Sequence, residues 1–461
     1  MPTTVLWLRR DLRLHDLPAL SAAHEAAAGG GVLPLYVLDE TLLSGAGGPR
    51  RRALGAALRR AQADYDGGLV VRRGDPRDVV PQVAREVGAG SVHVSGETTP
   101  YGRARDEAVH TLLWESLGIR LVPTGTPYAV SPGRLATAAG TPFRVFTPFA
   151  RAWRAHGAPG PDHPPAGLRW HRGPESCDDP LGGALHDARE GQREDAAEDP
   201  LRRWAGFLDD ALADYDATRD RPDLDGTSRL SEHLKFGAVH PRTLLAGIAA
   251  HEAGRTRGAA RFVDELAWRE FYADVLTHRP DSAWRDLRPS AMAWDDPRTD
   301  ERARHRWEAW CTGRTGYPFV DAGMRQLLTT GWMHNRLRMV TASFLVKDLH
   351  IAWQHGARFF LQHLRDGDLA SNNHGWQWAA GTGTDAAPFF RIFNPVTQGA
   401  RFDPGGDYVR AHVAELAGLP GRSVHEPWRS PDASRGGYPS PIVDHATERA
   451  EALARYEAAK A

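Results

Sequence analysis

The runs Val5-Leu-Trp-Leu8 and Val32-Leu-Pro-Leu-Tyr-Val-Leu38 open an alternation of short apolar segments with longer segments of helical periodicity. Apolar runs of this length are typical of strands that are buried on both faces of a sheet. Three further runs follow, at Leu69–Arg72, Ser91–Ser95 and Ile119–Pro123. The pattern predicts a doubly wound parallel sheet over residues 1–130.

Between these runs lie segments with apolar residues at helical spacing, namely Arg50–Tyr65, Arg77–Val87 and Arg103–Leu117. A dinucleotide-binding domain carries G-x-G-x-x-G directly after its first strand, and no such motif stands there. The sequence therefore argues against a Rossmann dehydrogenase.

The composition changes after the predicted sheet. From Gly157 to Pro200 it is dominated by Pro, Gly, Asp and Arg, which break helices and cannot pack a core. From Leu201 onward helical periodicity prevails and strand alternation is scarce. We expect three parts: an α/β domain over residues 1–130, a long surface connector over 131–200 and a larger all-α domain over 201–461.

The overall composition excludes several classes of protein. The chain has 461 residues and a net charge of −1, which rules out a uniformly basic coat but allows a local basic face. Its two cysteines, Cys177 and Cys311, are too few for a disulfide scaffold, and the 21 histidines form no defensible metal-ligand set. Because no run of 18 apolar residues occurs and the N-terminus is highly charged, we expect a soluble cytoplasmic protein.

Gly226-Thr-Ser-Arg-Leu-Ser231 opens a helical stretch, with Tyr215 and Arg219 just upstream. Hydroxyls and free backbone N–H groups at the start of a helix can bind an anion such as a phosphate. An ordinary N-cap made by Thr or Ser is the alternative, and it is more common.

Two segments combine aromatic and polar side chains. Glu265 and Trp268 are three residues apart and share a helix face, where an aromatic ring can stack on a base while a carboxylate bonds its edge. A core tryptophan beside a solvated charge is the alternative. In the segment Asp366–Trp378, helical geometry predicts that Trp376 and Trp378 face opposite sides.

Gly331-Trp-Met-His-Asn-Arg-Leu-Arg-Met339 places Asn335, Arg338 and Met339 on neighbouring helical positions, while Arg336 points elsewhere. A local basic patch for phosphate binding could form from residues near this helix in the sequence. Its candidate members are Arg325, Lys347, Arg358 and Arg365, and a solvated helix face is the alternative.

Taken in order, these segments resemble a class I cyclobutane pyrimidine dimer photolyase of the photolyase/cryptochrome family. The resemblance spans nearly the whole chain. It is carried by Leu8-Arg-Arg-Asp-Leu-Arg-Leu14, GTSRLS, WREFY, TGYPFVDAGMRQL, GWMHNRLRM, FLVKDL, DGDLASNN, GWQWAAGTGTDAAPFFRIFNP and Tyr438-Pro-Ser-Pro-Ile-Val-Asp-His445.

The resemblance implies FAD in the helical domain, with Asn372 facing flavin N5 as an uncharged amide and Arg338 paired with Asp366. The residues implied to bind FAD are Tyr215, Thr227, Ser228, Arg229, Leu230, Ser231, Phe262, Arg269, Arg338, Asp366, Gly367 and Asp368.

It also implies a flipped-out lesion that accepts an electron from the excited reduced flavin. Trp268 and Trp378 would wall the lesion pocket, Glu265, Asn335 and Met339 would contact the lesion, and Arg219 and Arg336 would meet the lesion or its phosphates. The indoles of Trp376, Trp353 and Trp310 would carry electrons from the surface to an oxidised flavin.

Three features distinguish this sequence from other members of the family. The (6-4) photolyases carry a histidine pair where this chain has His334-Asn335, and cryptochromes usually carry aspartate or cysteine where Asn372 stands. Cryptochromes also tend to add a C-terminal tail, whereas this sequence ends about 16 residues after His445. These three features favour repair over signalling.

A second, antenna chromophore is expected in the first domain. Tyr101-Gly102 stands where folate-binding members carry Asn-Glu, whereas Tyr101, Asp39 and Lys235 resemble members that bind 8-hydroxy-5-deazaflavin. Thr99 replaces an acidic residue of that pattern. We expect the deazaflavin, with an empty groove or folate as alternatives.

The expected protein is a deoxyribodipyrimidine photo-lyase that repairs UV-damaged DNA, a monomer without a membrane or an obligatory protein partner. A blue-light photoreceptor that signals through a protein partner is the main alternative. A flavoprotein that binds nucleic acid without repairing it is the third.

Overall fold

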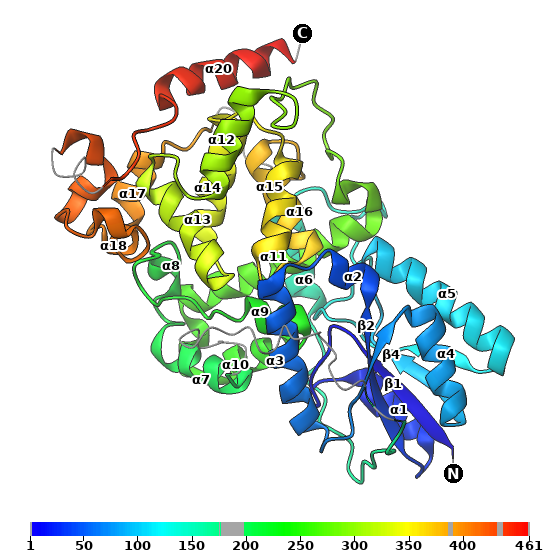
Figure 1. Ribbon diagram of the computed structural model, residues 1–461. Coiled ribbons are helices and arrows are strands. Elements are labelled where there is room, and N and C mark those ends of the chain that lie inside the picture. Colours follow the sequence, from blue (N-terminus) through cyan, green and yellow to red (C-terminus); the bar gives the residue numbers. More distant parts are fainter. Residues whose placement is uncertain (1, 175, 177–197, 386–390, 431–436, 460–461) are drawn as a thin grey trace. The chain divides into compact units, whose positions relative to one another are not determined.

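The computed structural model describes residues 2–174, 176, 198–385, 391–430 and 437–459 (Figure 1). The chain divides into two compact units. Unit 1 comprises Met1–Ala213, Ser228–Pro280 and Arg365–Asp368, and unit 2 comprises Asp214–Thr227, Asp281–Leu364 and Leu369–Ala461. Much of the expected connector, including Cys177, lies outside the described residues. The domain boundaries expected from the sequence stay a prediction.

Unit 1 contains a five-stranded parallel sheet in the order β3-β2-β1-β4-β5. This order reverses beside β1, as doubly wound folds do, and it confirms the predicted fold class. The strands are β1 (Thr3–Leu8), β2 (Val32–Asp39), β3 (Val70–Gly74), β4 (Ala89–Val94) and β5 (Arg120–Pro123), each within two residues of its predicted start and end.

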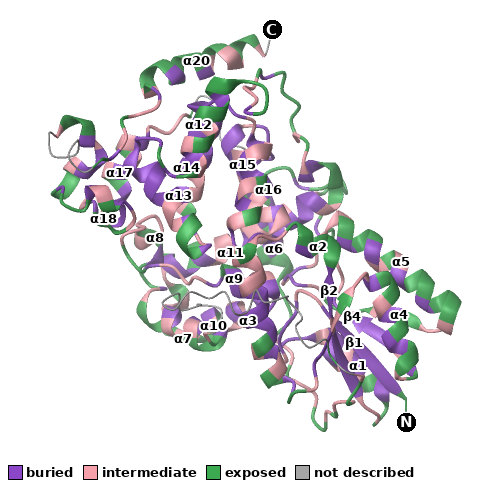
Figure 2. Cartoon of the chain, in the orientation of Figure 1, coloured by how far each residue is buried: buried purple, intermediate pink, exposed green. Residues whose placement is uncertain are grey.

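Alternate residues of the strands build two hydrophobic cores, one on each face of the sheet. Leu6 and Leu8 pack with the helices α1 (Pro18–Ala27) and α3 (Gly48–Asp64). Val5 and Trp7 join the opposite core, which includes residues of α4 (Pro76–Glu86) and α5 (Pro100–Leu117). Figure 2 shows the strands buried and α5 with an exposed outer side. Burial on both faces explains why the strands read as continuous apolar runs.

Helices before, within and after the expected connector belong to unit 1. They are α2 (Glu40–Ser44), α6 (Phe146–His156), α7 (Pro200–Asp210), α9 (Ser231–Phe236), α10 (Pro241–Ala250), η2 (Glu252–Arg255) and α11 (Arg257–His278). The described part of the connector lies against the sheet: Trp170 pairs with Val32 in an isolated bridge and its ring is 4.9 Å from that of Tyr65. This segment therefore runs over the surface of the sheet unit.

Unit 2 is helical, as predicted for the second half. Its elements are α8 (Tyr215–Thr218), α12 (Glu301–Cys311), α13 (Pro318–Thr330), α14 (Asn335–Lys347), α15 (Trp353–His363), α16 (Leu369–Ala380), α17 (Pro395–Phe402), α18 (Asp407–His412), η4 (Ala414–Leu416), η5 (Gly421–His425), η6 (Pro427–Arg429) and α20 (His445–Ala458). The short η3 (Pro280–Ala283) lies at the division between the units.

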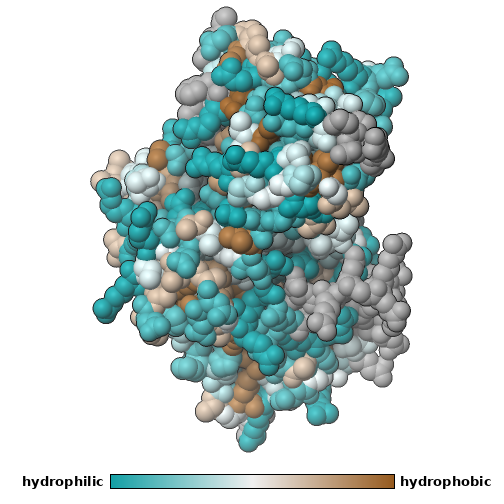
Figure 3. All heavy atoms as spheres, turned by 90° about the vertical axis from the view of Figure 1, so that its left-hand side faces the viewer, coloured by the Kyte–Doolittle hydropathy of each residue, from teal (hydrophilic) through white to brown (hydrophobic). Residues whose placement is uncertain are grey.

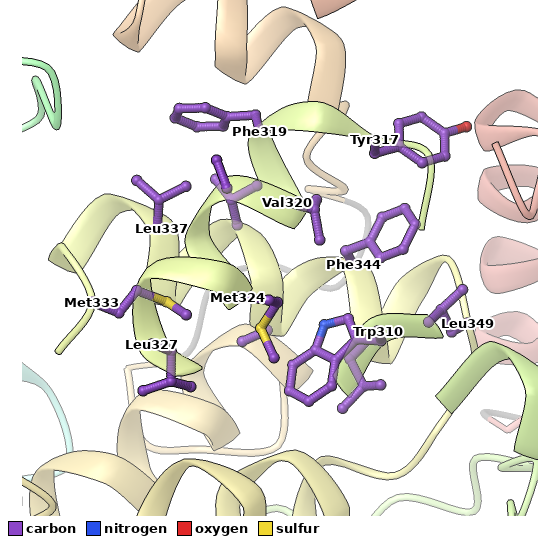
Figure 4. Close-up of a cluster of buried hydrophobic side chains, with 14 of the residues drawn as sticks. Trp310, Tyr317, Phe319, Val320, Met324, Leu327, Met333, Leu337, Phe344 and Leu349 are labelled. Carbon is purple, nitrogen blue, oxygen red and sulfur yellow. The ribbon is translucent and has the colours of Figure 1, made fainter. Parts of the chain in front are cut away.

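The core of unit 2 is rich in aromatic and sulfur-containing side chains. Trp310 is completely buried, and Figure 4 shows its indole beside Met324 with Phe344 nearby. Gly356 of α15 makes room for a second indole, because a Cβ atom there would lie 2.1 Å from the ring of Trp376. A larger residue at position 356 would displace that ring.

In the part of the chain that the structure describes, no helix is long and apolar enough to cross a membrane. The face of the molecule drawn in Figure 3 is mostly hydrophilic, with hydrophobic side chains in small separate patches.

Candidate cofactor and nucleic-acid site

The loop Ser228–Leu230 precedes α9, and this helix lacks the side-chain hydrogen bond that usually caps a helix N-terminus. Leu230 is the capping residue, and no side-chain cap bond forms there. Instead, the Leu230 N–H donates to Ser228 Oγ at 3.4 Å, and Arg229 has a positive φ of 50°. A left-handed conformation is unfavourable for a residue with a Cβ and is often retained at binding sites. The ordinary N-cap interpretation is therefore wrong for this helix.

The aspartates of the Asp366-Gly-Asp368 segment lie beside arginines of unit 1. Arg10 donates to Asp368 Oδ2 at 2.7 Å, and Arg50 donates to the Gly367 carbonyl at 3.3 Å. Asp366 is only 5% exposed. In the ion pair of Arg10 with Asp368 the two side chains are 13% and 14% exposed. Such a pair holds the loop in one conformation, because separating it would leave a largely buried charge unpaired.

A third arginine of this region, Arg269, is bound by backbone carbonyls. Arg269 donates to the carbonyls of Pro127 and Leu234 at 3.0 and 3.3 Å, and its guanidinium lies 4.5 Å from the ring centre of Tyr128. Arg10 approaches the same ring at 5.8 Å. The family resemblance implied Arg269 but not Arg10, Arg50 or Tyr128, although Arg10 lies in the segment Leu8–Leu14 that carries the resemblance.

The helix α11 carries Glu265 and Trp268 on neighbouring turns, as the spacing predicted. One face of the Trp268 indole stacks on Phe146, with ring centres 3.8 Å apart and planes at 9°. Trp268 is half-buried and Phe146 is buried. Because Phe146 occupies one face of the indole, it fixes the ring plane in the way a stacking platform requires. No local pattern singled out Phe146, because its contact with Trp268 joins residues far apart in the chain.

A buried carboxylate fixes the position of α11. Glu270 accepts bonds from the backbone N–H groups of Ala129 and Val130 at 2.5 and 3.0 Å and from Trp153 Nε1 at 2.6 Å. Burial raises the pKa of Glu270, although these donors lower it. The carboxylate thereby joins α11 to α6 and to the loop before it.

The residues expected at an antenna site are all in unit 1. Tyr101 donates its hydroxyl to Asp39 Oδ2 at 2.7 Å, and Arg105 lies 3.5 Å from the same oxygen. Gly102 makes room for Glu97, because a Cβ atom would lie 2.0 Å from the Glu97 side chain. Burial lowers the pKa of Lys235 to about 7, and the nearby Arg10 contributes to the shift.

In unit 2, the two arginines expected to meet DNA are joined by a carboxylate. Arg336 pairs with Asp220 Oδ2 at 2.8 Å, and Arg219 lies 3.7 Å from Asp220 Oδ1. The Arg336 guanidinium also covers the ring of Phe402 at 4.2 Å. Arg219 and Arg336 therefore form one cluster in which Asp220 already neutralises part of the positive charge.

The basic patch expected around α14 is wrong. Lys347 is 1% exposed and donates to the Arg391 carbonyl at 3.0 Å, and burial lowers its pKa to about 8. Arg325 is paired with Glu415 at 2.6 Å, and Arg365 with Glu232 at 2.8 Å. The prediction counted only charges that are near in sequence. Carboxylates from distant segments, Glu415 and Glu232, neutralise Arg325 and Arg365.

The start of α14 presents Asn335 and Met339 one turn apart, as predicted. Asn335 is exposed, Met339 is half-buried, and Asn335 Nδ2 lies 4.0 Å from Met339 Sδ. Arg338 is half-buried and donates from Nε to the Met333 carbonyl at 2.8 Å. The expected pair between Arg338 and Asp366 stays a prediction.

On α16, Asn372 uses both amide hydrogens within unit 2. Its Nδ2 donates to the Ala357 carbonyl at 3.1 Å and to Asn373 Oδ1 at 2.8 Å. The side chain is half-buried. With both N–H groups engaged, its Oδ1 is the atom suited to meet a ligand, and it can only accept a hydrogen bond.

The three indoles of the expected electron path lie in the unit 2 core. Trp376 and Trp310 have ring centres 6.0 Å apart, and Trp353 donates its N–H to Asp286 at 2.7 Å. Trp376, Trp353 and Trp310 are 2%, 1% and 0% exposed. The expectation that these three residues reach the surface is therefore wrong. As predicted, Trp376 and Trp378 differ in environment, because Trp378 is half-buried.

Comparison with known proteins identifies the family. Residues 4–167 match the family described as DNA photolyase, and residues 262–458 match the FAD binding domain of DNA photolyase. The deoxyribodipyrimidine photo-lyase of Streptomyces griseus is 42% identical, covering 100% of this chain and 99% of that protein. The Escherichia coli protein of the same name is 40% identical, with the same coverage. The chain therefore belongs to the photolyase/cryptochrome family.

Solved structures agree with this result. A bacterial class III photolyase from Agrobacterium tumefaciens superposes with a TM-score of 0.90 at 36% identity, covering 100% of this chain and 98% of that one. A cryptochrome from Synechocystis reaches 0.88 at 27% identity, covering 98% and 99%. The predictions of a photo-lyase enzyme and of an FAD-binding domain are confirmed.

Proposed function

We propose that this protein is a class I photolyase that repairs cyclobutane pyrimidine dimers in DNA with light. The observation that carries the proposal is the Trp268 indole stacked on Phe146, with Glu265 one turn away on the same helix. An indole braced on one face can stack a flipped base on the other, and the neighbouring carboxylate can bond the base edge. A cross-linked pair stacks poorly in the duplex, so it costs less to extrude than a normal pair.

Reduced FAD, when bound and excited by light, supplies the electron that splits the dimer. The chain offers groups that fit such a cofactor. The hydroxyls of Thr227, Ser228 and Ser231 and the guanidinium of Arg229 suit its phosphates. We propose that these residues bind FAD together with Tyr215, Leu230, Phe262, Arg269, Arg338, Asp366, Gly367 and Asp368.

The hydrogen-bonding pattern of Asn372 favours the reduced form of the flavin over the oxidised form. Its two N–H groups are engaged, so Oδ1 remains to accept a bond. Reduced flavin carries a hydrogen on N5 and can donate it, whereas oxidised flavin can only accept there. An amide acceptor also avoids the repulsion that a carboxylate would impose on an anionic flavin.

For the lesion, we propose contacts from Glu265, Asn335 and Met339 and pocket walls from Trp268 and Trp378. The cluster of Arg219, Asp220 and Arg336 would approach the lesion or its phosphates. Because Asp220 already pairs with both arginines, the cluster can bind a phosphate only weakly unless the ion pairs rearrange. The protein would act as a monomer in the cytoplasm.

We further propose 8-hydroxy-5-deazaflavin as an antenna chromophore in unit 1. Asp39, Tyr101 and Lys235 would contact it. The Tyr101 hydroxyl is aimed at Asp39, and a lysine with a pKa of about 7 can adapt its charge to an acidic chromophore. Fluorescence of chromophore released from the protein, expressed in a host that makes deazaflavins, tests this assignment; released folate would contradict it.

A blue-light photoreceptor is the second candidate, favoured by the structural similarity to the Synechocystis cryptochrome. Asn372 and the residue pair His334-Asn335 favour repair. Asn372→Asp would put a negative charge beside the anionic reduced flavin, so we expect it to slow repair and to destabilise the reduced flavin.

The deciding experiment uses purified protein with FAD, chemically reduced, and an oligonucleotide that holds one cyclobutane thymine dimer. We expect the dimer to be restored in light and not in the dark. Bound, reducible flavin with no repair in light would contradict the proposal and favour the photoreceptor.

A further inference from the structure

Trp307 connects the buried indoles of unit 2 with the protein surface. It lies three residues before Trp310 on α12, and the two rings stack with centres 5.4 Å apart and planes at 21°. Trp310 is completely buried, whereas Trp307 is half-buried and only packs against the edge of the core. Residues three apart on a helix share a face, which explains the contact.

The contact continues inward from Trp310. Its ring centre is 6.0 Å from that of Trp376, with planes at 69°, and Gly356 leaves the space that the Trp376 ring occupies. Trp307, Trp310 and Trp376 therefore form a continuous path of neighbouring indoles. These ring contacts run from Trp307 to Trp376 without Trp353 between them.

The surroundings of the two outer indoles suit an electron that moves inward. Trp310 donates its N–H to the Thr341 carbonyl at 3.1 Å in the buried core, so an oxidised Trp310 has no water to take its proton and must regain an electron from a neighbour. Trp307 meets His355 and Phe359 edge-on at 5.9 and 5.8 Å. Burial lowers the pKa of His355, which keeps this ring neutral at pH 7 and avoids opposing a positive charge on Trp307.

Trp284 provides a contrast on the same core. It is also half-buried and packs against the same cluster, but the Arg358 guanidinium covers its ring at 4.7 Å. A fixed positive charge over an indole disfavours removal of an electron from that ring. Trp284 therefore serves as a control: it has the same burial class as Trp307, but a positive charge lies over its ring.

We propose that Trp307 is the outer electron donor of a second path, Trp307–Trp310–Trp376, which reduces oxidised FAD under light independently of Trp353. The proposal rests on the proposed function, in which excited oxidised FAD is the acceptor at the inner end. One electron moves from Trp376 to this acceptor, one from Trp310 to Trp376 and one from Trp307 to Trp310. Trp307 is left oxidised by one electron and releases its N–H proton to water. An external thiol then returns one electron and one proton, and two thiols so oxidised join as a disulfide.

The test compares variants in a Trp353→Phe background, which removes the other predicted path. Oxidised, FAD-loaded protein is illuminated with dithiothreitol, and flavin reduction and the transient absorption of tryptophan radicals are recorded. We expect Trp353→Phe to retain photoreduction and a long-lived, deprotonated tryptophan radical. Trp353→Phe/Trp307→Phe should lose both, whereas Trp353→Phe/Trp284→Phe should match the background.

Several results would overturn the proposal. They are complete loss of photoreduction in Trp353→Phe alone, unchanged radicals after loss of Trp307, or an equal loss from the Trp284 control. Absence of photoreduction in the wild type would do the same. Each variant is also assayed for dimer repair after chemical reduction, which needs no electron path. Failure of that assay in the wild type would contradict the proposed function instead, so the two failures can be told apart.

Discussion

The two units hold their candidate site residues by different means. In unit 1, charged groups with little exposure fix the backbone: Arg10 is bound to Asp368, and Glu270 to two backbone N–H groups and an indole. In unit 2, the indoles of Trp310 and Trp376 pack in an aromatic core. Charges give directional bonds that position a residue, whereas packed indoles also provide neighbouring orbitals for electron transfer. Substitution of a buried charged residue in unit 1 should therefore affect stability and binding. Substitution of a buried indole in unit 2 should affect electron transfer.

The largest effect is expected from Trp376→Phe in unit 2. Both electron paths meet at this indole, so its removal should abolish photoreduction of oxidised flavin. Repair by chemically reduced protein should be spared, because the electron then starts on the cofactor. Absorbance under illumination and a repair assay measure the two properties on the same sample. Loss of repair in the reduced state would show that Trp376 has a structural or catalytic role instead.

Glu270→Ala tests the charged interior of unit 1. The substitution leaves the N–H groups of Ala129, Val130 and Trp153 without their acceptor. The Val130 and Trp153 donors are buried, and each buried donor without an acceptor costs about 1–3 kcal/mol. We expect a loss of roughly 2–6 kcal/mol in the free energy of unfolding, measured in urea.

Asp264→Ala, on the same helix, is the matched control. Asp264 pairs with Arg154 near the surface, and such pairs contribute less than about 1 kcal/mol. Equal losses for Glu270→Ala and Asp264→Ala would show that burial of Glu270 does not decide the stability of α11.

Trp268→Ala tests the proposed stacking platform. Stacking on a base contributes about 1–3 kcal/mol, so affinity for dimer-containing DNA should fall by that amount. Binding of undamaged DNA should change less, because no base is flipped onto the ring. Phe146→Leu should give a smaller loss of the same kind by releasing the ring plane. A uniform loss on both DNAs would contradict the stacking role.

The smallest effect concerns Lys347, a charge inside unit 2. Burial lowers its pKa from 10.5 to about 8 in the folded protein. Between pH 8 and 10.5 the unfolded chain therefore binds more protons than the native one, and stability rises with pH.

Lys347→Met should remove this contribution, which is at most about 1.4 kcal/mol per pH unit. Urea unfolding of both proteins at pH 7, 8 and 9 (about one unit apart) measures it. If the free energy of unfolding changed with pH in the same way for both proteins, Lys347 would be solvent-exposed, as the predicted basic patch requires.

The fold was predictable because the sheet is buried on both faces. Continuous apolar runs such as Val32–Leu38 are produced by that burial, and they locate all five strands within two residues of their ends. The grouping of α11 with the sheet unit was not visible, because it depends on contacts such as Glu270 with Ala129, far apart in sequence.

The candidate site was predictable where it depends on local spacing and family motifs. Glu265 with Trp268 and Asn335 with Met339 lie on common helices as expected. The basic patch failed because Glu415 and Glu232, distant in sequence, neutralise Arg325 and Arg365. Phe146 and Trp307 were missed because stacking partners have no sequence signature, and because burial of Trp310 is a tertiary property.

The central claim is that the flipped lesion is a cyclobutane dimer. The most direct measurement gives chemically reduced protein two labelled oligonucleotides in one solution, one with a cyclobutane thymine dimer and one with a (6-4) photoproduct. Under light, we predict that only the cyclobutane dimer is restored, with neither lesion changed in the dark. Repair of the (6-4) product, or of neither lesion while the flavin stays reduced, would contradict the account.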